Sequence, residues 1–135
     1  MIKVTSPVDV KYNCVAWAAD DTKRIWWPEE DYYWPIQYPE IESVENFIKA
    51  FETLGYECCD DDSLEYGCRK IAIFVNSEER PTHVARQLKS GEWTSKLGAL
   101  VDVSHDLYDL YKDHVLSFYG KVAIIMKAEE WKLGR

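Results

Sequence analysis

The chain has 135 residues, 47% of them hydrophobic, and a formal net charge of -8. That length suits one core, so we expect a single domain over residues 1–135. The excess of Asp and Glu opposes contact with phosphate backbones, so nucleic acid is not an expected partner. No apolar stretch has the length of a signal peptide or a membrane span, which predicts a cytoplasmic protein with reduced thiols and no membrane partner.

The first predicted helix begins at or beside Cys14, because Asn13 is a favoured N-cap and the Ala-rich stretch after it contains neither Gly nor Pro. Residues 25–38 hold two prolines among six Trp and Tyr residues, which predicts an ordered aromatic loop. Its Trp27 and Trp34 are candidate contact residues for a peptide or sugar. The rings of such a loop can equally pack into a small core, and we favour packing.

Two further elements have clear periodicity. Apolar residues recur at helical spacing between Ser43 and Leu54, and Gly55 follows where a C-terminal cap needs a left-handed residue. The apolar run 70–75 predicts a buried strand. The acidic run 60–62 between these elements predicts a solvated turn.

The second half of the chain predicts more strands. Residues 82–88 and 93–97 suit two strands of a hairpin, and residues 121–126, after Gly120, suit a final core strand. Between them, Ser104 is expected to cap an amphipathic helix whose shared face is formed by Leu107, Leu110 and Tyr111. The predicted fold is α+β, with N-terminal helices packed on a small antiparallel sheet.

The length of the hairpin loop decides which side chain approaches His83. If the loop spans residues 89–91, with Gly91 in the left-handed conformation, Ser95 lies diagonal to His83 on the same face. A two-residue loop would shift the register and bring Lys96 to that face instead. We favour Ser95, since Gly91 suits the longer loop.

Cys14 and His83 are the candidate nucleophile and its acid–base partner. A helix start and a nearby imidazolium both favour the thiolate, and the imidazole can then protonate the leaving group. Ser95 would orient the ring, with Lys96 and His105 as alternatives. A buried cysteine without function and a hydrogen-bonded strand histidine are the structural alternatives. No cofactor is required, and the cysteines lack the paired spacing of a zinc site.

Other polar residues are candidate binding residues. Arg86 and Lys96 can offer charges to an acidic group of a ligand, or pair with the surplus carboxylates. His105, with Asp102, is expected near the start of the helix capped by Ser104, where it can cap that helix or line a cleft. Asn13 and Gln87 complete the set of candidates, and a peptide or protein is the expected substrate.

The order of these elements resembles a known group of enzymes. A cysteine at a helix start, then a strand, then His83-Val84-Ala85 and a polar residue in the next strand is similar to the NlpC/P60 and CHAP groups of papain-like cysteine hydrolases. Those hydrolases usually have Asp where this chain has Asn13, and a stronger orienting group than Ser95. Four blocks, 12–18, 82–88, 91–98 and 102–105, also resemble an uncharacterised bacterial family of small proteins.

The resemblance implies a papain-like fold and a thiol hydrolase or acyltransferase acting on an amide, isopeptide or related acyl bond. Cys14 would attack the carbonyl, His83 would move the proton, and Ser95 would orient His83. Two alternatives remain: a non-catalytic binding or accessory protein that uses the aromatic loop, and an effector or toxin acting as a deamidase or protease.

Overall fold

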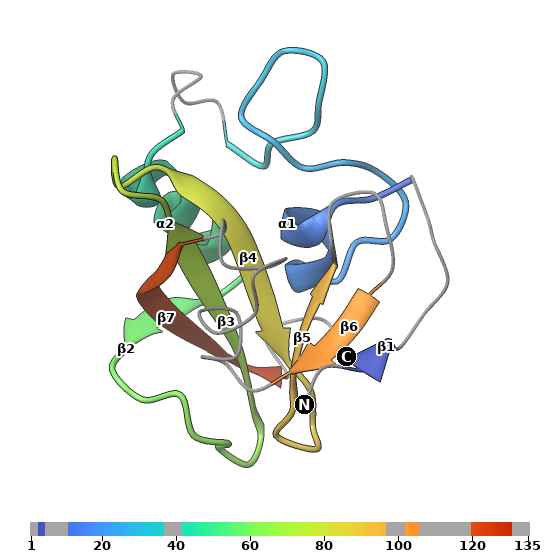
Figure 1. The fold of residues 1–135 in the computed structure, drawn as a ribbon, viewed down its shortest axis with the longest axis vertical. Coiled ribbons are helices and arrows are strands. Elements are labelled where there is room, and N and C mark those ends of the chain that lie inside the picture. The colour runs from blue at the N-terminus through green and yellow to red at the C-terminus, as the bar shows by residue number, and fades with distance from the viewer. Residues whose placement is uncertain (1–2, 5–10, 37–41, 97–101, 106–119, 131–135) are drawn as a thin grey trace.

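One mixed sheet-and-helix domain is seen in the computed structural model, which describes residues 3–4, 11–36, 42–96, 102–105 and 120–130. A seven-stranded sheet, antiparallel throughout, has the order β1-β6-β5-β4-β3-β7-β2 (Figure 1). The elements are β1 (Lys3–Val4), α1 (Cys14–Ala18), α2 (Val44–Glu52), β2 (Glu57–Cys59), β3 (Cys68–Val75), β4 (Pro81–Gln87), β5 (Trp93–Lys96), β6 (Asp102–His105) and β7 (Lys121–Glu129).

Two of the three predicted helix starts, the one beside Asn13 and the one at Ser43, are confirmed. The side chain of Asn13 accepts a hydrogen bond from the Ala16 N–H at 3.1 Å, which caps α1. Ser43 caps α2 in the same way, through the Asn46 N–H at 3.1 Å. Beyond α2, Gly55 has a φ of 97°, in the left-handed region that its position predicts.

The sheet is buried on both faces in its centre. On one face, α1 and α2 cover a large cluster that includes Ile71, Ile73 and Val84. Because successive side chains of a strand point to opposite faces, the alternate residues of β3 and β4 form the second cluster. Its members are Ala72, Phe74, Ala85, Trp93 and Ile125. Burial on two faces explains the nearly continuous apolar run that predicted β3.

The hairpin between β4 and β5 has the longer of the two predicted loops. The Leu88 N–H donates to the Glu92 carbonyl at 2.8 Å, and Gly91 has a φ of 92°. In the strands, Arg86 pairs with Thr94. The three-residue loop is therefore confirmed, and Ser95 continues the register on the same face as His83.

The predicted helix start at Ser104 is wrong. Residues 102–105 form strand β6, in which Ser104 pairs with Thr94 of β5 and with Lys3 of β1. Asp102 and His105 therefore lie in a strand and do not cap a helix. Ser104 is a local capping signal, but the open edge of β5 offers a ladder of backbone hydrogen bonds, and that pairing prevails. Leu107, Leu110 and Tyr111 lie outside the described residues.

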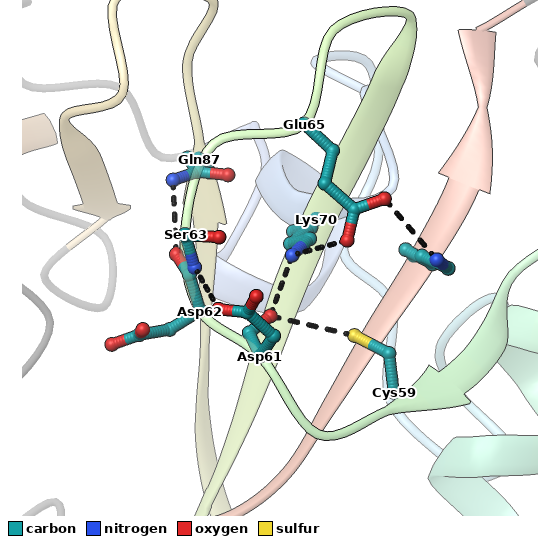
Figure 2. A network of polar contacts seen from close by, with 8 residues as sticks. Cys59, Asp61, Asp62, Ser63, Glu65, Lys70 and Gln87 are labelled. Atoms are coloured by element: carbon teal, nitrogen blue, oxygen red, sulfur yellow. Dashed lines mark hydrogen bonds and ion pairs between the residues drawn. The ribbon is translucent and has the colours of Figure 1, made fainter.

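The acidic turn after β2 is solvated as predicted, but it also covers a buried lysine (Figure 2). Lys70 of β3 is fully buried, and its Nζ donates to the Asp61 carbonyl at 2.6 Å and meets Glu65 Oε1 at 3.0 Å. Lys127 lies opposite Lys70 on β7 and contacts the other oxygen of Glu65 at 3.2 Å. The carboxylate of Glu65 therefore lies between the ammonium groups of Lys70 and Lys127, two residues that face each other across neighbouring strands.

Glu65→Gln should destabilise the protein more than Lys70→Met, because it leaves the buried ammonium beside a neutral amide. We expect Lys70→Met to change the free energy of unfolding by less than about 1 kcal/mol, and the double variant to recover most of the Glu65→Gln loss. Urea unfolding at pH 7 measures all three, with exposed Glu78→Gln as the control. Equal losses for both single variants would contradict this account.

The same ion pairs predict a pH dependence. Hydrogen bonds from Lys70 and Lys127 lower the pKa of Glu65 below its ordinary 4.5. A carboxyl with a lowered folded-state pKa contributes stability above its unfolded pKa and loses it as the pH falls through the folded value. The difference between the wild type and Glu65→Gln should therefore shrink below about pH 4.5.

Candidate functional site

Cys14 is the first residue of α1 and is buried, with 7% of its surface exposed. Asn13 fixes the start of this helix to the aromatic loop as well as capping it. Its Oδ1 also accepts from the Trp26 N–H at 3.1 Å, and its Nδ2 donates to the Trp26 carbonyl at 2.8 Å. The amide of Asn13, a predicted binding residue, thus uses both ends within the fold and sets the position of Cys14.

His83 and Ser95 are in direct contact, as the hairpin register predicts. His83 Nε2 lies 2.7 Å from Ser95 Oγ, and both side chains are fully buried. The ring of His83 also packs edge-on against Phe74, with 5.5 Å between the ring centroids. The hydroxyl and the aromatic ring together hold the imidazole plane. The other ring nitrogen, Nδ1, is buried as well.

The side chains of Cys14 and His83 lie on opposite faces of the sheet. Cys14 lies in the same buried cluster as Val84, whereas His83 packs on Phe74 of the opposite cluster. Helix α1 packs against β4, on the Val84 face. Next to His83, β3 and β4 change register between Phe74 and Val75. The Cys14–His83 pair stays a prediction.

Arg86 secures the C-terminal end of α1. Its Nη1 donates to the Trp17 carbonyl at 3.2 Å and to Asp20 Oδ1 at 3.0 Å, and its guanidinium lies 4.3 Å from the centroid of the Trp17 ring system. The Trp17 indole in turn donates to Thr94 Oγ1 at 3.1 Å. Of the two predicted roles of Arg86, pairing with a carboxylate is the one seen here.

The remaining predicted binding residues divide into two groups. Gln87 Nε2 donates to the Asp62 carbonyl at 3.2 Å (Figure 2). It also donates to the Gly91 carbonyl at 3.3 Å, so it links the acidic turn to the hairpin. Lys96 and His105 lie in β5 and β6, opposite Asp102 and Trp93 respectively. Their side chains lie outside the described part of the molecule.

A protein-family model described as a domain of unknown function, DUF7689, matches residues 3–127. The chain belongs to the DUF7689 family. No curated protein and no solved structure matches it. The DUF7689 match runs from β1 into β7 and so includes Cys14, His83 and Ser95. Neither helix in the described part of this DUF7689 protein is long and apolar enough to cross a membrane.

In this DUF7689 domain the aromatic loop packs against α2 and is hydrogen-bonded to it. Trp26 is buried, and its indole donates to Asp21 at 2.9 Å. Trp27 and Trp34 both pack on Phe47, with centroid distances of 5.5 and 4.9 Å. Their indole nitrogens donate to side chains at the start of α2, Glu42 and Asn46, each at 3.2 Å. The packing alternative therefore accounts for these rings.

Trp27→Ala and Trp34→Ala should each lower the free energy of unfolding by about 2 kcal/mol, since each loses a half-buried ring and an indole hydrogen bond. Tyr32→Ala is the matched control, because that ring is 44% exposed and the change should cost less than about 0.5 kcal/mol. Chemical denaturation measures all three. If the Trp27→Ala/Trp34→Ala double variant has the same free energy of unfolding as the wild type, the rings do not stabilise the fold and a contact surface is the better interpretation.

The contacts of Asp20 were not predicted from the sequence. This residue follows α1 with a φ of 65° and meets both Arg86 and Arg69. The run Asp20-Asp21 after a helix and an arginine at the edge of the apolar run were the available signals. Neither signal gives the partner, because the contact joins residues about fifty or more positions apart in the chain.

Proposed function

We propose that this DUF7689 protein is a thiol hydrolase or acyltransferase of papain-like fold, acting on an amide, isopeptide or related acyl bond. The observation that carries the proposal is the buried 2.7 Å contact between His83 Nε2 and Ser95 Oγ, on a strand against which the Cys14 helix packs. A buried imidazole with one nitrogen held by a hydroxyl is suited to move a proton at its other nitrogen.

In the proposed reaction the Cys14 thiolate attacks the carbonyl carbon, and a sulfur–carbon bond forms. The backbone N–H of Cys14, at the helix start, would stabilise the oxyanion. His83 then donates its Nδ1 proton to the leaving amine as the carbon–nitrogen bond breaks, which leaves a thioester on Cys14. Water, or an acceptor amine or alcohol, gives a proton to His83 and attacks the thioester, and the thiolate leaves.

The reaction makes one geometric demand on this fold. Cys14 Sγ must come within hydrogen-bonding reach of His83 Nδ1, about 3 to 4 Å. Because the side chains of Cys14 and His83 start on opposite faces of the sheet, the thiol has to reach the imidazole ring past the first residues of β4. The register change between Phe74 and Val75 opens the regular ladder at that point.

Alkylation by iodoacetamide tests the proposal without knowledge of the substrate. We expect Cys14 to react faster than Cys58, Cys59 and Cys68 in the folded protein, although Cys14 is buried and Cys58 is exposed. Burial, with the nearby Glu52 and Cys59, raises the pKa of the Cys58 thiol and slows it further. Mass spectrometry of the modified peptides gives each rate, and Cys14→Ser assigns the fast site.

A second candidate function is a non-catalytic binding protein of the same fold. The placement of Cys14 and His83 on opposite faces of the sheet favours this non-catalytic function. In that case burial alone sets the reactivity, and Cys14 is the slowest of the four thiols. The same alkylation experiment therefore separates the two functions, since each predicts the opposite order of rates.

A further inference from the structure

Two nearly buried arginines share one carboxylate at the end of the sheet. The side chains of Arg69, on β3, and Arg86, on β4, are 8% and 11% exposed. Asp20 places Oδ1 3.0 Å from Arg86 Nη1 and Oδ2 3.7 Å from Arg69 Nη1. Each guanidinium carries a full positive charge and five N–H donors in a planar fork.

A cavity of about 420 Å³ opens beside these arginines. The hairpin supplies Lys89 and Ser90 to its wall, and Glu130, which follows β7, also lines it. Lys89 Nζ lies 3.7 Å from Glu130 Oε2. The volume falls in the range of small-molecule sites, and the wall combines an arginine pair with a hydroxyl.

The charges of the described residues around this cavity do not cancel. Among the described residues that line it, Arg69, Arg86 and Lys89 are positive, and Glu130 is negative. This local excess stands in a chain of net charge -8. An anionic ligand group suits such a wall. A planar carboxylate also matches the fork of a guanidinium better than a point charge does.

We propose that this cavity binds the carboxylate of a small molecule or of a peptide end, with Arg69 and Arg86 as the anchoring pair. The partial burial of both guanidiniums strengthens the attraction relative to a surface pair. The site is distinct from the Cys14 site, because the described residues that line the cavity do not include Cys14, His83 or Ser95. The proposal therefore does not depend on the proposed thiol chemistry.

The test is a titration of the folded protein with N-acetylglycine at constant ionic strength, followed by the NMR signals of the arginine Nε–H groups. We expect saturable shifts at Arg69 and Arg86. Arg69→Gln should weaken binding by about tenfold or more, the effect of losing a hydrogen bond to a charged group. Lys89→Ala, at a side chain 83% exposed, should fold normally and weaken binding severalfold. Arg80→Ala, an exposed arginine away from the cavity, is the matched control.

Inorganic phosphate provides the second arm. Weaker binding of phosphate than of N-acetylglycine at the same signals supports a carboxylate site, whereas tighter phosphate binding overturns it. The absence of saturation in the millimolar range, or an equal loss in Arg80→Ala, overturns the site itself. If Arg69→Gln fails to fold, unchanged binding by Lys89→Ala overturns the proposal. None of these outcomes bears on the alkylation of Cys14.

Discussion

His83→Ala slows the alkylation of Cys14 by about 10- to 30-fold at pH 7 if the proposed pair exists. An unassisted thiol is only a few per cent thiolate at that pH, whereas a thiol paired with an imidazolium is largely thiolate. The pH dependence should change as well. The rate should be nearly flat from about pH 6 to 8 in the wild type, and rise about tenfold per pH unit in the variant.

Two controls separate this effect from a loss of packing. His83 is fully buried against Phe74, so His83→Ala also leaves a void, and its unfolding must be measured beside its rate. Ser95→Ala keeps the ring and removes its hydroxyl partner, so it should slow alkylation less than His83→Ala does. Identical rates and pH profiles in the wild type and His83→Ala would exclude the pair.

Asn13→Ala should lower the free energy of unfolding by about 3 kcal/mol. The side chain caps α1, which contributes about 1 kcal/mol, and makes two hydrogen bonds to the backbone of Trp26, each of similar value. Denaturant unfolding measures the loss. A change of less than about 1 kcal/mol would show that the aromatic loop holds its position without Asn13.

Asn13→Asp is the informative companion variant. It keeps the oxygen that accepts from Ala16 and Trp26, and a negative charge suits a helix start. It loses the Nδ2 donor and sets a carboxylate against the Trp26 carbonyl, 2.8 Å away in the present contact. We expect an intermediate loss of about 1 to 2 kcal/mol. The need to donate to the Trp26 carbonyl thus explains why Asn suits position 13 better than Asp does.

The Asn13→Asp variant also has an expected effect on the Cys14 thiol. A carboxylate at position 13 would disfavour the neighbouring Cys14 thiolate, so Asn13→Asp should slow alkylation at neutral pH even where the protein remains folded. An unchanged alkylation rate would mean that the thiol is insensitive to charge at its own helix start.

The parts of the fold that follow from local chemistry were predictable. The N-caps Asn13 and Ser43 set both helix starts, and the three-residue loop ending at Gly91 set the hairpin register. The contact between Ser95 and His83 then follows, because register decides which side chains share a face. Each of these signals acts within a few residues, so the sequence alone carries it.

The parts that depend on distant partners were not predictable. Residues 102–105 became a strand because β5 offered an edge, which overrode the capping signal of Ser104. Lys70 became fully buried because the acidic turn supplies Glu65 and a carbonyl. The face of β4 that α1 covers is likewise a matter of packing. The sequence therefore predicted the Cys14–His83 pair, but it did not predict that the two side chains start on opposite faces of the sheet.

The distance from Cys14 Sγ to His83 Nδ1 in a crystal structure of the full chain tests the central claim most directly. The proposed thiol chemistry predicts about 3 to 4 Å, with His83 Nε2 still on Ser95. A sulfur held on the Val84 face, with β4 between it and the ring and no path for a hydrogen bond even through one water, would contradict the claim.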